Sequence, residues 1–386
     1  MTNCAIVCEY NPFHTGHKYQ LDAVRNRGTD NIVCIMSGNF VQSADPAFCD
    51  KSLRAECAVR GGADAVIELP TLYATASAQY FAEGALKISA QIKDIKHIAM
   101  GATVSPDKIL SIYDAKSKNS EAFHNIFYRE LKSGKSYNIA NATAYSAVYG
   151  PCDDIFSDPN NILCLEYISA IEKYSPTIEP IIIERVGASY GSLSTDEKYI
   201  SATAIRHAVD CGNVDKISDY IPYLKDDIIA WHNAYRPNLG AYEIMAVYAV
   251  KSMAPNIIKN LKDCSEGLEH LIKKYADTSD YNTLINSSVG KRYGIKRIKR
   301  LLFDAVTNQE KELLACSFVT RLLACKQDFD FSILPGFVKT NNADIKKASE
   351  NTEIKRVLSV DERAAALYNS ICSVGGDYYN YSLIKV

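Results

Sequence analysis

The stretch that decides the fold is Cys4-Ala5-Ile6-Val7-Cys8-Glu9-Tyr10-Asn11-Pro12-Phe13-His14-Thr15-Gly16-His17. Its first five residues form an apolar run rich in β-formers, which is typical of a buried strand. Pro12 disfavours helix in the residue before it, so we expect a turn over residues 9–13. After Gly16 the apolar residues follow a helical spacing as far as Gly28, a candidate C-terminal cap. The stretch therefore predicts a strand, a turn and a helix in that order.

Two histidines, His14 and His17, lie where this helix begins. The N-terminus of a helix presents unpaired N–H groups and the positive end of its dipole. Gly16 lets a phosphate or a ring approach the backbone, and the imidazoles add hydrogen-bond donors. These features predict a nucleoside triphosphate site. The alternatives are a chance match to a short pattern and half of a metal site, although no third ligand with suitable spacing accompanies the pair.

The composition fits an ordinary globular enzyme of two domains, with 386 residues, 47% hydrophobic and 23% charged. No apolar run is long enough for a membrane span, and the first residues show no charged start followed by an apolar core, so we expect neither a membrane span nor a signal sequence. The twelve cysteines are scattered and form no CxxC pair, so we expect free thiols, a cytoplasmic location and no membrane partner. The net charge of −2 argues against indiscriminate nucleic-acid binding but allows a local basic face.

The first half of the chain alternates expected strands and helices. Strands are expected over 31–36, 65–69, 97–100 and 180–184. Helices are expected over 51–60, 76–90 and 105–150. This α/β alternation predicts a parallel sheet with right-handed crossovers, whose ligands collect at the carboxyl ends of its strands. The residues that follow an expected strand, and so should face one crevice, are His14, Ser37, Gly101 and Arg185.

The pattern changes near residue 215. Strand-like runs stop there, and helical periodicity dominates over 241–253, 268–275 and 294–306. We therefore predict a boundary between a nucleotide-binding domain, residues 1–215, and a mainly α-helical domain, residues 216–386.

A second candidate phosphate element is Ser201-Ala202-Thr203-Ala204-Ile205-Arg206. Ser201 is a good helix N-cap, and Thr203 and Arg206 lie on neighbouring turns of one helical face. Arg206 could fork two phosphate oxygens, whereas the alternative is a purely structural cap. Lys51 and Arg54 are further candidate cations, with a solvated helix face as the alternative.

The two elements HTGH and SATAIR together resemble the HIGH-type nucleotidyltransferase superfamily. The runs EYNPFHTGH, MSGNFVQ, KSLRAE, GADAVIELP, PNNIL, ERVGASY and SATAIR resemble the bacterial tRNA(Met) cytidine acetate ligase family over residues 3–210. That family activates acetate with ATP as acetyl-adenylate and acetylates N4 of the wobble cytidine of elongator tRNA(Met). The resemblance implies this function and a Rossmann-like nucleotidyltransferase domain before the helical domain. It also implies ATP as co-substrate, Mg²⁺ arriving with it, and no dedicated metal site or tightly bound cofactor.

The resemblance also implies the site residues. The catalytic residues are His14, His17 and Arg206. The ATP-binding residues are Val7, Cys8, Glu9, Tyr10, Asn11, Pro12, Phe13, His14, Thr15, Gly16, His17, Lys18, Tyr19, Gln20, Gly101, Asn160, Asn161, Arg185, Ser201 and Thr203. We expect the histidines to donate hydrogen bonds rather than move protons, because acetate is already ionised. Glu9 is a candidate base for the acyl transfer, with a turn or capping acid as the alternative.

A basic run follows at residues 291–300, with six basic residues and no acidic one. Its apolar residues predict a buried stripe, which leaves the charges on the outer face. We expect this face to contact tRNA phosphates and Tyr293 to be exposed and to stack on a base, whereas the alternative is a solvated helix face. The predicted tRNA-binding residues are Lys291, Arg292, Tyr293, Lys296, Arg297, Lys299 and Arg300.

Some positions depart from the family pattern. Ser43-Ala44 stand where the family usually has Arg-Gly, Ala102-Thr103 replace Ser-Glu, and Gly191 replaces a histidine. Two other functions therefore stay open. One is an adenylyltransferase that makes a dinucleotide cofactor, and the other is a non-catalytic RNA-binding relative.

Overall fold

The sheet organises the molecule. In the computed structural model, which describes residues 2–187, 192–194, 197–277 and 280–386, it has eight strands in the order β5-β4-β1-β2-β3-β6-β7, with β8 beside β6. The strands are β1 (Asn3–Cys8), β2 (Asn31–Ser37), β3 (Ala65–Leu69), β4 (Ile95–Ala102), β5 (Glu179–Glu184), β6 (Thr320–Cys325), β7 (Val338–Lys339) and β8 (Ile384–Lys385). The first five pair in parallel, which confirms the predicted parallel sheet.

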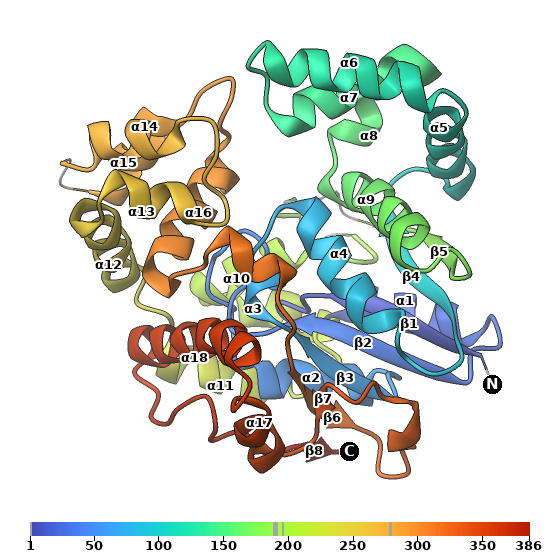
Figure 1. Cartoon of the computed structure of the whole chain (residues 1–386). Coiled ribbons are helices and arrows are strands. Elements are labelled where there is room, and N and C mark those ends of the chain that lie inside the picture. Colours follow the sequence, from blue (N-terminus) through green and yellow to red (C-terminus); the bar gives the residue numbers. More distant parts are fainter. Residues whose placement is uncertain (1, 188–191, 195–196, 278–279) are drawn as a thin grey trace.

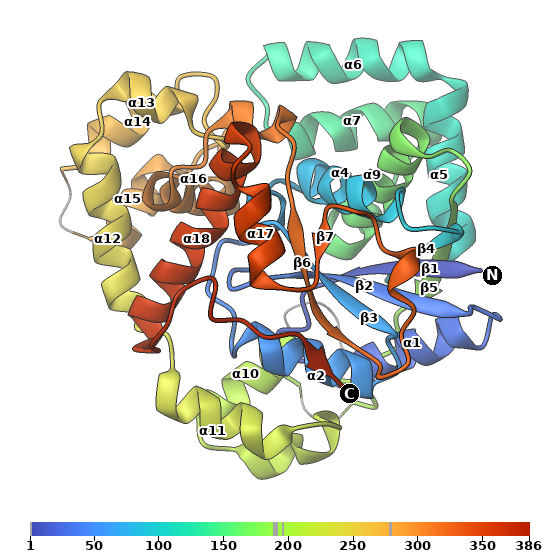
Figure 2. The same ribbon diagram turned by 60° about the horizontal axis from the view of Figure 1, so that its bottom comes forward.

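Helices cover both faces of this sheet (Figures 1 and 2). On one face pack α3 (Thr71–Ala74), α4 (Ala78–Ser89), α5 (Pro106–Lys118) and α9 (Pro159–Tyr174). On the other face pack α1 (Thr15–Arg25), α2 (Lys51–Arg60), α10 (Ala202–Asp210) and α11 (Lys225–Tyr235), with a 3₁₀ segment at Val214–Tyr220. In β1, Ala5 joins the first core, whereas Cys4 and Ile6 join the second. This alternation is the period of two that side chains follow along a strand.

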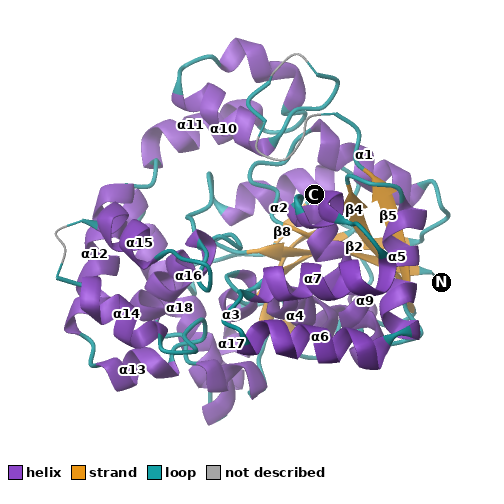
Figure 3. Cartoon of the chain, turned by 90° about the horizontal axis from the view of Figure 1, so that it is seen from above, coloured by secondary structure: helices purple, strands orange, loops and turns teal. Residues whose placement is uncertain are grey.

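Two helical arms extend from the sheet. The α5–α8 arm consists of α5, α6 (Ser120–Lys132), α7 (Tyr137–Tyr149) and α8 (Asp153–Phe156). The five-helix arm consists of α12 (Leu239–Ser252), α13 (Pro255–Asn260), α14 (Leu268–Tyr275), α15 (Tyr281–Ser288) and α16 (Ile295–Thr307). Figure 3 shows the five-helix arm beside the sheet, packed with α18 (Thr352–Cys372). This arm has its own apolar core, which includes Phe40 and Leu301.

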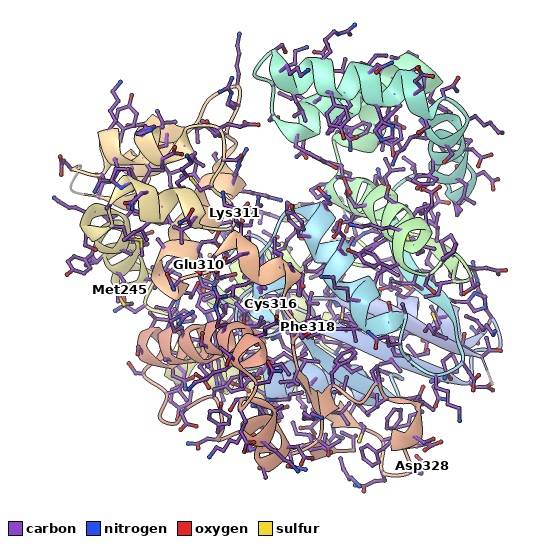
Figure 4. The ribbon with its side chains drawn as sticks, viewed as in Figure 1. Met245, Glu310, Lys311, Cys316, Phe318 and Asp328 are labelled. Atoms are coloured by element: carbon purple, nitrogen blue, oxygen red, sulfur yellow. The ribbon has the colours of Figure 1, made fainter. Side chains whose placement is uncertain are left out.

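The chain returns to the sheet after the five-helix arm, so the expectation that strands stop near residue 215 is wrong. β6 pairs antiparallel with β3, and Thr320 donates a hydrogen bond from its hydroxyl to the Glu68 carbonyl. Two 3₁₀ segments (Lys311–Ala315 and Phe331–Ile333) and α17 (Asn342–Ala348) complete this region. At the junction shown in Figure 4, Lys311 donates to the Cys264 carbonyl and Phe318 packs on Tyr73. Both halves therefore contribute to one sheet, and a boundary at residue 215 stays a prediction.

Candidate active site

Two histidines cap the N-terminus of α1. His14 is the N-cap residue, and its Nδ1 accepts the backbone N–H of Gly16 at 3.1 Å. Nδ1 of His17 accepts the backbone N–H of His14 at 3.2 Å, and the two rings stack with centroids 3.7 Å apart. Because each Nδ1 accepts a hydrogen bond, the proton of each neutral ring lies on Nε2. Each imidazole therefore presents an Nε2–H donor.

Both imidazoles are neutral at physiological pH. Burial lowers the pKa of His14 to about 3, and the charges of Arg185 and Arg206 act in the same direction. Burial also lowers the pKa of His17 well below its usual value, with His14 and Arg185 contributing. The cause is that desolvation disfavours the charged ring and the nearby guanidinium groups repel it.

Gly16 is required by the close packing of the first imidazole. A Cβ built on Gly16 would lie 2.9 Å from Cε1 and 3.1 Å from Nδ1 of His14. Such contacts would push the ring away from the backbone N–H that it caps. The glycine of the HTGH sequence thus allows the imidazole to fold back over its own helix.

The SATAIR element begins α10 as expected. Ser201 is the N-cap, and its hydroxyl accepts the N–H of Ala204 at 3.0 Å. Arg206 donates to the Asn11 carbonyl at 2.7 Å and to the Thr203 hydroxyl at 3.2 Å. The guanidinium group therefore ties the first turn of α10 to the loop that precedes α1.

The carboxyl ends of β4 and β5 complete the positive side of the site. Arg185, which follows β5, donates to Oδ1 of Asn160 at the start of α9 at 3.2 Å. A Cβ on Gly101, near the end of β4, would lie 3.4 Å from Cγ of Arg185. The chain therefore brings together three predicted residues that are far apart in sequence.

These elements surround a cavity of about 510 Å³, a volume typical of ligand sites. Lys296, which belonged to the predicted tRNA set, also lines it. The other predicted site residues that line it are Val7, Cys8, Glu9, Tyr10, Asn11, His14, Gly16, His17, Tyr19, Gln20, Gly101, Asn160, Arg185, Ser201, Thr203 and Arg206.

Five predicted ATP-binding residues, Pro12, Phe13, Thr15, Lys18 and Asn161, lie outside the cavity lining. Phe13 packs in the core, with its ring 5.0 Å from that of Tyr10. Lys18 forms a surface ion pair with Asp22. Asn161 is fully buried, where its Oδ1 accepts the N–H of Thr103 and its Nδ2 donates to the Thr103 hydroxyl. Asn161 thus supports the loop after β4.

Sequence reasoning missed several lining residues, among them Gln42, Asp45, His232 and Arg236. The backbone N–H of Gln42 donates to Oε1 of Glu9 at 2.7 Å, and burial raises the pKa of that carboxyl. Gln42 belongs to the MSGNFVQ run, one of the runs that carry the family resemblance, so the resemblance pointed to this residue indirectly. His232 lies in α11, Arg236 directly follows this helix, and both side chains contact Asp210. No local sequence pattern indicates that these residues reach the cavity.

Residues 1–378 match the family model of the HIGH Nucleotidyl Transferases. The chain belongs to this family.

Relatives and solved structures agree with this assignment. The chain is 34% identical to the tRNA(Met) cytidine acetate ligase of Acetivibrio thermocellus, over 80% of this chain and 79% of that protein. It is 30% identical to the enzyme of that name from Oceanobacillus iheyensis, over 96% and 95%. The crystal structure of Thermotoga maritima TmcAL bound with alpha-thio ATP has a TM-score of 0.86 at 25% identity, with full coverage of both chains. The predicted family is therefore confirmed, and neither alternative function is favoured.

The structure shows the conformation, contacts or burial of most positions that depart from the family pattern. Ala44 has φ 62°, a left-handed conformation that favours the glycine usual in the family. The Ser43 hydroxyl donates to Asp45, and Ser43 lines the cavity. Ala102 is buried in β4. Gly191 lies outside the described residues.

The basic run differs from its expected form. Tyr293 is buried and donates from its hydroxyl to the Glu266 carbonyl at 2.6 Å, so the expectation of an exposed ring is wrong. Ile295, expected in the buried stripe, is exposed. Arg297 donates to the Asp263 carbonyl, Lys299 pairs with Asp45, and Arg300 pairs with Asp263. Only Lys291, Arg292 and Lys296 of the seven predicted tRNA-binding residues are exposed.

Lys51 and Arg54 are internal, so the solvated-face alternative is wrong for them. Lys51 pairs with buried Glu68 at 2.6 Å. Arg54 is fully buried and donates to the carbonyls of Glu9, Ser37, Gly38 and Cys49. Arg54 therefore fixes the backbone of the loops around the cavity.

Two kinds of feature are absent from the part of the chain that the structure describes. It contains no helix long and apolar enough to cross a bilayer. The same residues include no group of three or more His, Cys, Asp or Glu side chains placed to hold a metal ion.

Proposed function

We propose that this chain uses ATP to activate acetate as acetyl-adenylate and then acetylates N4 of the wobble cytidine of elongator tRNA(Met). The observation that carries the proposal is the pair of neutral imidazoles at the N-terminus of α1, which face a cavity shared with Arg185 and Arg206. The names of the relatives supply the acetate and the tRNA, and the Thermotoga maritima structure supplies a bound ATP analogue.

The first step joins two anions. An oxygen of acetate attacks the α-phosphorus of ATP, the bond to the β-phosphate oxygen breaks, and pyrophosphate leaves. The Nε2–H groups of His14 and His17 offset the charge that develops on the phosphate, together with Arg185 and Arg206. Neutral donors suit this step because acetate needs no base. Mg²⁺ arrives with ATP and is bound mainly by its phosphates.

The second step moves the acetyl group. N4 of cytidine attacks the carbonyl carbon, the bond to the adenylate oxygen breaks, AMP leaves, and N4 gives up one proton. Glu9 is a candidate acceptor for that proton, because it lines the cavity and burial makes its carboxylate more basic. The backbone N–H of Gln42 holds Oε1 of Glu9, which fixes the carboxylate at the wall of the cavity.

The tRNA reaches the cavity along the five-helix arm. Lys296 is exposed on α16 and also lines the cavity, so it connects the basic run to the reaction centre. Lys291 and Arg292 extend this line of positive charge away from the cavity and are suited to phosphate contacts. Residues 1–215 thus carry activation, and residues 216–386 carry most of the RNA contact.

The experiment is incubation of the protein with ATP, labelled acetate and bulk tRNA, followed by nucleoside analysis. Labelled N4-acetylcytidine is the expected product. Pyrophosphate exchange that needs a phosphorylated vitamin derivative, and not acetate, would instead indicate a dinucleotide-forming adenylyltransferase. Thermal stabilisation by ATP without acetate-dependent exchange would indicate a non-catalytic relative.

A further inference from the structure

A second cavity lies on the α5–α8 arm, apart from the active site. It has a volume of about 360 Å³, near the lower end for small-molecule sites, which suits one small ring system. Helices α4 and α9 line both cavities. They give Phe81 and Tyr167 to the active site, and Glu83 and Glu166 to this second cavity. We call it the arm pocket.

The walls of the arm pocket are aromatic. Phe123 and Tyr145 meet edge to face with centroids 4.8 Å apart, and Phe127 and Tyr137 do so at 5.3 Å. Tyr128, another lining residue, is 56% exposed, so the pocket reaches the surface. Such walls favour a flat ring that packs against them.

The polar groups of the arm pocket include an amide without a partner. Asn141 is 7% exposed and lines the pocket, and its side chain makes no hydrogen bond to any residue that the structure describes. The amide is not sealed in the core, so it faces the open pocket and is available to a ligand there. The amide offers one donor group and one acceptor, the pair that Asn uses to bind the edge of a base.

A carboxyl group lines the same pocket. Glu166 is 7% exposed, and Tyr137 donates a hydrogen bond to its Oε1 at 3.3 Å. Burial raises the pKa of Glu166 to about 7. The lone pairs of its carboxyl oxygens can accept a hydrogen bond from an exocyclic amine, as carboxyl groups do with cytosine. Aromatic walls with an amide and a carboxyl at the edge match a nucleobase.

The arm pocket also adjoins the basic run. A Cβ built on Gly134, in the turn between α6 and α7, would lie 2.6 Å from Nη2 of Arg292. Tyr137, three residues after Gly134, lines the pocket. An RNA strand held along the exposed cations of the basic run would therefore pass close to the pocket.

We propose that the arm pocket binds one unpaired nucleobase of the RNA substrate, a base other than the cytidine that reacts. Single-stranded RNA is commonly recognised by bases that leave the stack, insert between aromatic rings and form hydrogen bonds along their edges. This assignment rests on the proposed function, because it assumes that the chain binds tRNA.

The test compares Asn141→Leu with Asn138→Leu, a change in the same helix at an exposed position that does not line the pocket. Binding of an elongator tRNA(Met) transcript is measured by fluorescence anisotropy. We expect Asn141→Leu to weaken binding about tenfold, the order expected for one lost amide–base contact, and Asn138→Leu to leave it unchanged. The unfolding temperature of Asn141→Leu should not fall, because leucine replaces an unpartnered amide. Equal binding by both variants would overturn the assignment.

A second measurement uses the wild-type chain, so it does not depend on how the variant folds. Transcripts with 4-thiouridine at unpaired positions are photo-cross-linked to the protein and the linked peptides are identified. Links within residues 123–145 are expected, and links found only elsewhere would contradict the assignment. Binding of free nucleosides that Asn141→Leu abolishes, with tRNA binding intact, would assign the pocket to a free nucleoside instead. Acetate-dependent exchange by the wild-type chain without RNA tests the proposed function separately.

Discussion

The histidine-capped crevice and the basic run present positive groups in different ways. In the crevice, backbone N–H groups fix both imidazoles, so the donors at Nε2 are oriented before any ligand arrives. In the basic run, neighbouring carboxylates and carbonyls already hold Arg297, Lys299 and Arg300. The number of basic residues in a segment is therefore a poor measure of how many anions it can bind. In the two imidazoles, by contrast, Nδ1 already accepts a hydrogen bond, so Nε2 is the atom left to bind a ligand.

The strongest effect should fall on the crevice itself. His17→Ala removes one oriented donor, which should reduce acetate-dependent ATP–pyrophosphate exchange by about 10²–10³. The matched control is His270→Ala, since the side chain of His270 is mostly exposed and lies outside the cavity lining. Exchange by His17→Ala at the wild-type rate would show that the crevice, like much of the basic run, is only structural.

A smaller effect should follow from displacing the first imidazole without removing it. Gly16→Ala places a methyl group against the His14 ring, and we expect exchange to fall about tenfold because misplaced catalytic groups lose rate steeply. Gly290→Ala is the control, because a Cβ there meets nothing within 4 Å. If the two alanine variants exchange equally fast, the orientation of the ring is not what matters.

The basic run gives a still smaller effect, which distinguishes two of its exposed cations from the buried Arg300. Removing Lys291 and Arg292 together should lower the slope of log K against log salt for tRNA binding by about two, near one per phosphate contact. Arg300→Ala should leave the slope unchanged, because Arg300 is occupied by Asp263. Loss of the ion pair with Asp263 should instead lower the unfolding temperature of Arg300→Ala. An equal slope for the wild type and the double variant would contradict the assignment of this surface.

The smallest effect is expected in the pH dependence of the exchange rate. Because the pKa of His14 is about 3 and that of His17 is well below its usual value, neither ring changes charge as the pH passes through the range of an ordinary histidine. The exchange rate should therefore show no inflection near about pH 6.5, where an ordinary histidine titrates. A fall in rate on acidification through that pH, beyond the change caused by protonation of the ATP and pyrophosphate phosphates, would mean that a histidine becomes charged there.

Much of the fold and the crevice could be predicted because the signals are local. The strand, turn and helix around His14 lie within one short stretch, and Ser201 caps its helix through a residue three positions away. The strand β6 could not be predicted, since Thr320–Cys325 is buried along its whole length and shows no alternation. Its Leu and Ala residues also favour a helix, and only pairing with β3 makes it a strand.

The remaining parts of the site depend on contacts between distant segments. His232 reaches the cavity from α11, and no periodicity near it indicates this position. The burial of Tyr293 likewise depends on Glu266, which lies in another part of the five-helix arm. Charge composition shows that a basic segment exists. It does not show which of its side chains the fold has already paired.

A crystal structure of this chain with a non-hydrolysable ATP analogue would test the oriented imidazole donors most directly. We predict phosphate oxygens within hydrogen-bonding distance of Nε2 of both His14 and His17. A nucleotide bound elsewhere, with these two Nε2 atoms contacting only protein, would contradict the proposed role of the pair.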